Sequence, residues 1–119
     1  MSVQLDGLNL PKSGQLDIDI RLSATINITA FAARQKVTGY LADEISTNMH
    51  GGPPTLSVGE RITWRVPVIL SLPPHGDMGE VGHIDVDVET GQMMVSQALV
   101  QDIQHRAEAL AARPTPQTA

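Results

Sequence analysis

Residues 79–94, GEVGHIDVDVETGQMM, carry the clearest structural signal in this chain of 119 residues. In this stretch Ile84, Val86 and Val88 alternate with the polar residues of positions 83, 85 and 87, which is the period-two pattern of a strand with one buried and one solvated face. Thr90-Gly91 has the composition of a tight turn, and residues 92–95 can form the return strand. The stretch therefore predicts a β-hairpin.

Two other stretches show the same alternation. The first begins at Leu16 and ends either near Ala24 or Thr25 or at Ile28, and the second covers residues 62–72. Pro67 lies in the middle of the second stretch. Because proline has no N–H to donate to a β-ladder, this strand is expected at an edge of the sheet or with a bulge at Pro67.

Two helices are expected, each with its own capping residue. Thr29, with Asn27 as a competing candidate, can cap a helix whose apolar residues recur on one face, namely Ala30, Ala33, Val37, Leu41 and Ile45. The sequence HGGPP at residues 50–54 ends this helix, because proline cannot continue it. Ser96 can cap a second helix, before Pro114, with the apolar stripe Leu99, Val100, Ile103, Ala107 and Leu110.

The order of these elements, with a short strand over residues 55–58, predicts an α+β fold. We expect a mainly antiparallel sheet of four to five strands, with two helices packed on one face. The single domain is expected over residues 15–113, after a flexible N-terminal arm of residues 1–14. Residues 114–119 are expected to form a disordered tail.

Composition and charge argue against several classes of function. The net charge is −5 with only eight Lys and Arg residues, so we expect no nucleic-acid partner and no attachment to an anionic membrane. No apolar run approaches the ~18 residues that a membrane span needs. The chain has no cysteine and begins without the pattern of a secretory signal, which makes a cytoplasmic protein the expectation.

The polar residues of the strands share one face of the predicted sheet: Asp17, Asp19, Arg21, Thr63, Arg65, His83, Asp85 and Asp87. His83, Asp85 and Asp87 form a line of possible metal ligands about 7 Å apart, and His75 on the preceding loop could complete the site. Alternatively, the aspartates pair with the two arginines across the strands. We favour ion pairing, because ligands from one strand without an enclosing loop seldom make a closed metal site.

The sequence contains no clear catalytic constellation. Asp85 and Asp87 could act as an acid–base pair only in a pocket that separates their pKa values. No serine lies in a Gly-x-Ser-x-Gly turn, and Gly76, Gly79 and Gly82 lead into a strand instead of a phosphate-binding helix. We therefore expect neither an enzyme nor a cofactor.

Candidate partner-binding residues lie on the strand of Pro67 and on a predicted loop over residues 73–79: Trp64, Pro67, Ile69, Pro74 and Met78. Trp64 has two interpretations, since it could anchor a partner or be the largest residue of the core. The core is favoured because Ile62 and Val66 share its face of the strand.

Three segments resemble PepSY-type modules: the helix from Ala30 to Ser46, WRVPV at residues 64–68 and IDVDVETG at residues 84–91. The resemblance covers about half of the chain. It implies a non-catalytic module that binds or inhibits other proteins, often peptidases, usually outside the cytoplasm.

Two functional hypotheses follow. The first is a small protein-binding or regulatory module, inhibitor-like or antitoxin-like, whose partner is another protein or a second copy in a homodimer. It would act through a sheet edge or the loop of residues 73–79. The alternative is a metal-dependent binding protein or hydrolase that uses the His/Asp face of residues 81–88.

Overall fold

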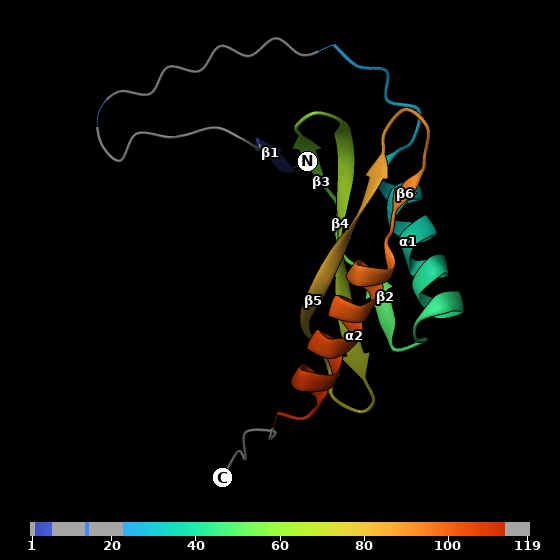
Figure 1. Ribbon diagram of the computed structural model, residues 1–119, viewed down its shortest axis with the longest axis vertical. Coiled ribbons are helices and arrows are strands. Elements are labelled where there is room, and N and C mark those ends of the chain that lie inside the picture. Colours follow the sequence, from blue (N-terminus) through green and yellow to red (C-terminus); the bar gives the residue numbers. More distant parts are fainter. Residues whose placement is uncertain (1, 6–13, 15–22, 114–119) are drawn as a thin grey trace.

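The computed structural model describes residues 2–5, 14 and 23–113 (Figure 1). Its elements are β1 (Ser2–Leu5), α1 (Ala30–Glu44), β2 (Met49–Gly51), β3 (Thr55–Val58), β4 (Ile62–Leu72), β5 (Gly76–Asp87), β6 (Met93–Met94) and α2 (Gln97–Ala111). Strands β2 to β6 pair antiparallel, and β1 joins β3 in parallel. The predicted α+β fold is confirmed. The disordered tail expected over residues 114–119 lies outside the described residues.

β4 is the central strand, which contradicts the edge position predicted from Pro67. One side of β4 pairs with β5, and the other pairs with β3 at one end and with β2 at the other. Pro67 lies opposite the gap between β2 and β3, where its carbonyl accepts the N–H of Gly52 at 2.8 Å. A residue's N and O point to the same side of a strand, so the missing donor of Pro67 faces this gap. The gap between β2 and β3 therefore accommodates Pro67, which has no N–H to donate.

β5 contains two bulges, and both lie beside a glycine. Its register with β4 shifts at Val81 and again at Met78, where β5 has one residue more than its partner. Gly79 and Gly82 have φ angles of +145° and +152°, which side chains rarely tolerate. The strand thus extends back to Gly76, and the predicted loop of residues 73–79 is shortened to a turn of residues 73–75.

Both predicted helix caps are confirmed. The Thr29 hydroxyl accepts the N–H of the third residue of α1 at 3.0 Å, and Ser96 does the same for α2 at 3.1 Å. α1 ends at Glu44, before the predicted stop at residues 50–54. The difference arises because Met49–Gly51 pair with β4 and form the unpredicted strand β2.

Residues 23–29, which directly precede α1, are held by hydrogen bonds and form no strand. The N–H groups of Asn27 and Ile28 both donate to the carbonyl of Val88, at 2.8 and 3.1 Å. The indole N–H of Trp64 donates to the carbonyl of Ile28 at 2.7 Å. The predicted continuation of the first strand to Ile28 is therefore wrong, while its part over residues 16–22 lies outside the described residues.

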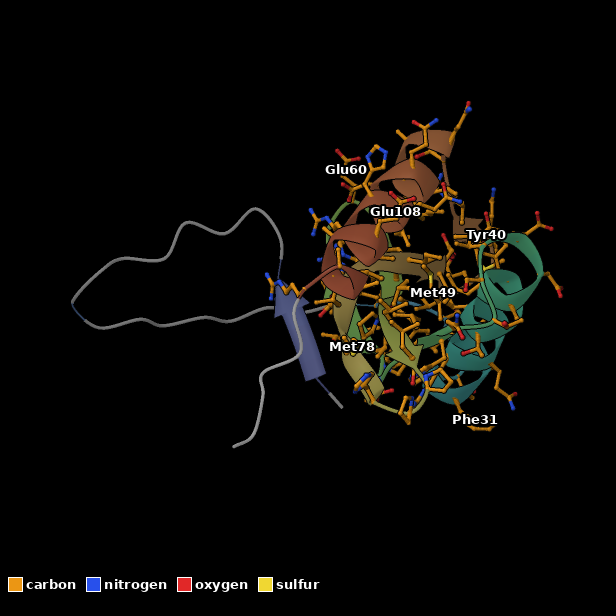
Figure 2. All side chains as sticks on the ribbon, turned by 90° about the horizontal axis from the view of Figure 1, so that it is seen from below. Phe31, Tyr40, Met49, Glu60, Met78 and Glu108 are labelled. Atoms are coloured by element: carbon orange, nitrogen blue, oxygen red, sulfur yellow. The ribbon has the colours of Figure 1, made fainter. Side chains whose placement is uncertain are left out.

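The core lies between the sheet and the two helices. Figure 2 shows Met49 inside the molecule and Phe31 at its margin. The buried apolar side chains of this core are Ala33, Val37, Leu41, Met49, Trp64, Val66, Val68, Leu70, Val81, Ile84, Val86, Val88, Ile103 and Ala107. Both helices contribute to this one cluster, so they pack on the same face of the sheet and leave its polar residues on the other.

Candidate functional site

The polar face of the sheet contains a cross-strand ion pair. Arg65 and Asp85 are register partners on β4 and β5, with Nε 3.1 Å from Oδ1 and Nη2 3.4 Å from Oδ2. The pairing predicted for Arg65 is confirmed. Asp17, Asp19 and Arg21, which were expected on the same face, lie outside the described residues.

Asp87 holds the turn between β5 and β6. Its Oδ1 accepts the backbone N–H groups of Glu89 at 2.8 Å and Thr90 at 3.1 Å, while Arg61 lies 3.6 Å from Oδ2. The N–H of Thr90, then that of Glu89, lower the pKa of Asp87 because they stabilise its ionised form. This carboxylate is therefore engaged in the fold at the predicted Thr90-Gly91 turn.

The proposed metal ligands are spread along the hairpin. His75 and His83 are exposed, whereas Asp85 is paired with an arginine and Asp87 with backbone N–H groups. Within residues 2–5, 14 and 23–113, no three His, Asp or Glu side chains are grouped so that they could hold a metal ion. The described geometry thus offers no particular support for the metal hypothesis.

The candidate partner residues divide into buried and accessible ones. Trp64 is only 5% exposed, and Met78 is partly buried against the core, so neither presents an open binding surface. The core interpretation of Trp64 is confirmed. Pro67 and Ile69 are half-buried on the polar face, and Pro74 is exposed in the β4–β5 turn.

A polar cluster that the sequence did not suggest lies at the turn between β4 and β5. We name it the hairpin-tip site and define it as His50, Ser71, Asp77 and the turn of residues 73–75. Across β4, Ile69 pairs with His50 on one side, and Ser71 pairs with Asp77 on the other. The three strands thus bring together residues that are 27 positions apart in the chain. A hollow of about 510 Å³ adjoins the site, lined by Thr47, Asn48, His50, Ser71, Pro73, Pro74 and Gly76.

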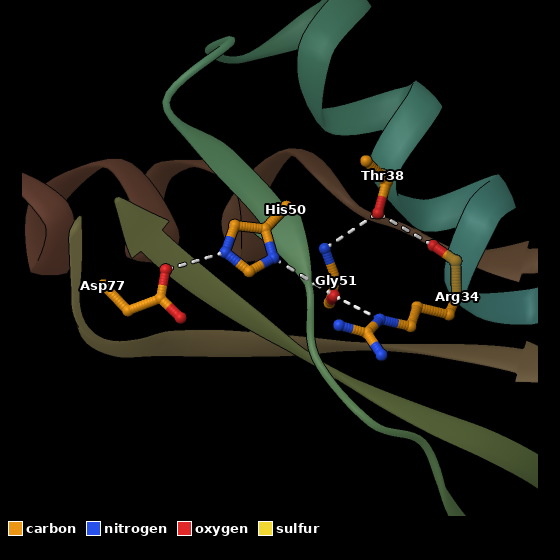
Figure 3. Close-up of polar contacts among 5 residues, drawn as sticks. All are labelled: Arg34, Thr38, His50, Gly51 and Asp77. Atoms are coloured by element: carbon orange, nitrogen blue, oxygen red, sulfur yellow. Dashed lines mark hydrogen bonds and ion pairs between the residues drawn. The ribbon is translucent and has the colours of Figure 1, made fainter. Parts of the chain in front are cut away.

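His50 is the centre of this cluster (Figure 3). Its Nε2 lies 3.1 Å from Oδ1 of Asp77, and its Nδ1 lies 3.3 Å from the carbonyl oxygen of Gly51. Each ring nitrogen therefore lies beside an oxygen acceptor, one on β5 and one on β2. The ring joins the hairpin to β2.

Gly51 extends the connection to α1 (Figure 3). Its carbonyl also accepts from Arg34 Nε at 2.8 Å, and its N–H donates to Thr38 Oγ1 at 2.9 Å. The Thr38 hydroxyl in turn donates to the carbonyl of Arg34 at 2.9 Å. Side chains from α1, β2 and β5 thus form one hydrogen-bonded network that ends at Asp77.

The electrostatics of Asp77 give a direct test of this network. The hydrogen bond from His50, and then that from Ser71, lower the pKa of Asp77 below its ordinary value of 3.8. We expect His50→Gln to raise the pKa of Asp77, measured by carbon-detected NMR titration, while Asp87 stays low as an internal control. If His50→Gln left the pKa of Asp77 unchanged, the result would contradict the contact between His50 and Asp77.

The same shift sets the sign of a stability effect. Because the pKa of Asp77 is lower in the folded state, its contribution to the free energy of unfolding is present above the unfolded pKa. That contribution is lost as the pH falls through the folded pKa, below 3.8. We expect acid to destabilise the wild type more than Asp77→Asn in this pH window.

No protein-family model matches the chain, and no curated protein or solved structure shows significant similarity to it. The resemblance to PepSY-type modules therefore stays a prediction. Neither α1 nor α2 has the length and apolar composition that a helix needs to cross a lipid bilayer.

Proposed function

We propose that this chain is a non-catalytic protein-binding module whose contact surface is the hairpin-tip site. One observation carries the proposal: the turn is exposed and yet braced. Every residue from Pro73 to Asp77 is exposed, while Asp77 is tied through His50 and Gly51 to α1. The bracing links an otherwise exposed hairpin tip to two other elements.

Bracing of an exposed turn favours binding. A partner that docks on a flexible loop has to order it, at about 0.5–1.5 kcal/mol for each immobilised side chain. Here Pro73 and Pro74 restrict the backbone, and the Asp77–His50 contact fixes the start of β5. Much of the ordering cost is therefore met during folding, before any partner arrives.

The surface around the turn has the mixed character of a protein interface. The rings of Pro73 and Pro74 offer apolar contact, whereas His75 and Asp77 offer polar groups at the rim. The adjoining hollow of about 510 Å³ could receive one side chain of a partner. An inhibitor-like or antitoxin-like role, in the cytoplasm, is the form of this function that the small acidic chain suggests.

A charge substitution at the centre of the turn tests the proposal. We expect His75→Glu to weaken capture of the partner from the native host by roughly tenfold or more, because the new carboxylate would be desolvated without a counter-charge. Gln104→Glu, which makes the same charge change on the exposed surface of α2, is the matched control and should retain the partner.

Both variants should melt at the wild-type temperature, since positions 75 and 104 are exposed. The measurement is quantitative mass spectrometry of proteins that co-purify at low and at high salt. Equal capture by the two variants, or recovery of the wild-type chain alone at every salt concentration, would overturn the proposal.

A further inference from the structure

The outer edge of β5, on the side away from β4, is open over most of its length. β6 pairs only with Asp85 and Val86, and no other ladder between described strands lies along this side of β5. The outer edge of β2 differs, because Arg34 and Thr38 of α1 close it at Gly51. β5 therefore leaves main-chain groups available for a further strand.

The register with β4 shows that the N–H and C=O groups of His83 face this open edge. Its partner Pro67 bonds on the side away from β5, where its carbonyl accepts the N–H of Gly52 at 2.8 Å. Opposite residues of an antiparallel ladder exchange either two hydrogen bonds or none. By the same argument Asp77 faces outward, because its partner Ser71 donates its N–H to a carbonyl just before β2, at 2.7 Å.

The two bulges of β5 preserve the spacing of these outward groups. Glu80 also faces outward, because its partner Ile69 lies midway between the two β4 residues that bond away from β5. Asp77, Glu80 and His83 are three positions apart on β5, whereas their partners on β4 are two positions apart, since each bulge takes up one residue. The outward groups therefore recur about every 7 Å, which is the spacing that an added strand requires.

A hollow lies between this edge and the second half of α2. Figure 1 shows α2 beside this part of β5, and a Cβ at Gly79 would lie 3.4 Å from the Leu110 side chain. The hollow has a volume of about 240 Å³ and is lined by Glu80, Arg106, Ala109, Leu110 and Arg113. The open edge and the helix thus form the two sides of one groove.

The charge of the groove differs in sign from that of the whole chain. Its lining carries two positive charges and one negative charge, whereas the chain carries a net charge of −5. Arg106 is exposed beside Asp102 at 3.0 Å, and Arg113 is exposed and forms no ion pair with any residue that the structure describes. The groove therefore favours a segment with acidic side chains.

We propose that this groove binds an extended acidic segment of another protein, which adds to the sheet as a strand along β5. Main-chain hydrogen bonds at Asp77, Glu80 and His83 hold the segment, and its acidic side chains face Arg106 and Arg113. The groove does not include the turn of residues 73–75. It is therefore independent of the hairpin-tip proposal, and the two proposals can fail separately.

An acetylated heptapeptide amide in which valine alternates with glutamate is the probe. At a peptide concentration of about ten times the dissociation constant, we expect the amide protons of Glu80 and His83 to exchange with water roughly tenfold more slowly. The measurement is hydrogen exchange followed by NMR. The same peptide with lysine in place of glutamate should bind roughly tenfold more weakly, because its charges repel the arginines.

N-methylated peptides separate strand addition from simple attraction between charges. Successive N–H groups of a strand point to opposite sides, so only every second one can face β5. One peptide is N-methylated at its valines and a second at its glutamates. We expect one of the two to lose binding and the other to retain it.

Arg113→Gln should weaken binding of the glutamate peptide by about two- to fivefold, the effect of one exposed ion pair. Gln104→Glu, the matched control, makes the same change in net charge on the opposite side of α2 and should bind as the wild type does. Unchanged exchange at Glu80 and His83, equal effects of the two N-methylated peptides, or equal binding of the lysine peptide would overturn the proposal. Protection of both amides in the free chain would also overturn it, because another strand would then already occupy the edge.

Discussion

Replacement of Gly82 by alanine is expected to lower the free energy of unfolding by about 2–5 kcal/mol, from backbone strain and overpacking together. Gly82 has a φ of +152°, and a Cβ at this position would lie 2.8 Å from Cγ1 of Ile103. Because α2 packs on β5 at this point, either the Ile103 side chain or the helix itself would have to move away from the sheet. Urea unfolding followed by circular dichroism measures the change, against a typical domain stability of about 5–15 kcal/mol.

Gly39→Ala is the control for the Gly82 experiment. Gly39 lies on the exposed side of α1, and a methyl group added there would meet no atom within 4 Å. Alanine should stabilise the helix at this position by about 0.5–1 kcal/mol. Ile103→Ala removes the opposing carbon, so its combination with Gly82→Ala should cost less than the sum of the two single changes. Equal effects of alanine at positions 82 and 39 would contradict the close approach of α2 to β5.

Sequence patterns predicted the elements that depend on residues close together in the chain. The helix caps at Thr29 and Ser96 depend on a hydroxyl and an N–H three residues later, and both are confirmed. The β5–β6 hairpin likewise follows from the alternation before Thr90-Gly91 and from the turn itself. The Asp87 carboxylate strengthens that turn from inside the hairpin.

Features that depend on distant parts of the chain were not predictable in this way. Pro67 indicated an edge strand or a bulge, because the sequence alone does not reveal that β2 and β3 leave a gap opposite this residue. Gly79 likewise indicated a loop, whereas in the fold it lies beside a bulge under α2. In both cases the residue's local preference is met by a neighbour that only the tertiary structure supplies.

The hairpin-tip site was missed for the same reason. His50 lies in a three-residue strand, too short for a periodic pattern, and its partner Asp77 belongs to the predicted loop of residues 73–79. The useful signal was compositional: a histidine before Gly-Gly-Pro-Pro and an aspartate after Pro-Pro-His-Gly. Such signals mark turns, and the pairing of β2 and β5 with β4 determines which turn residues meet.

Replacement of Trp64 by alanine is the second change for which we expect a large effect. Trp64 is 5% exposed within the core, so its removal should lower the free energy of unfolding by about 3–5 kcal/mol. It would also remove the hydrogen bond to the Ile28 carbonyl, which helps to hold the chain where it enters α1. Hydrogen exchange should therefore accelerate in the first turn of α1 more than in α2.

Two aromatic controls separate the packing of Trp64 from its hydrogen bond. Trp64→Phe keeps a buried ring but leaves the Ile28 carbonyl without its indole donor, which should cost about 1–3 kcal/mol. Phe31→Ala removes an aromatic ring that is 68% exposed, and surface changes of this kind usually alter stability by less than about 0.5 kcal/mol. The expected order of destabilisation is Trp64→Ala, then Trp64→Phe, then Phe31→Ala. If Trp64→Ala were as stable as Phe31→Ala, Trp64 would have to lie at the surface. That result would contradict the core interpretation and favour Trp64 as an anchor for a partner.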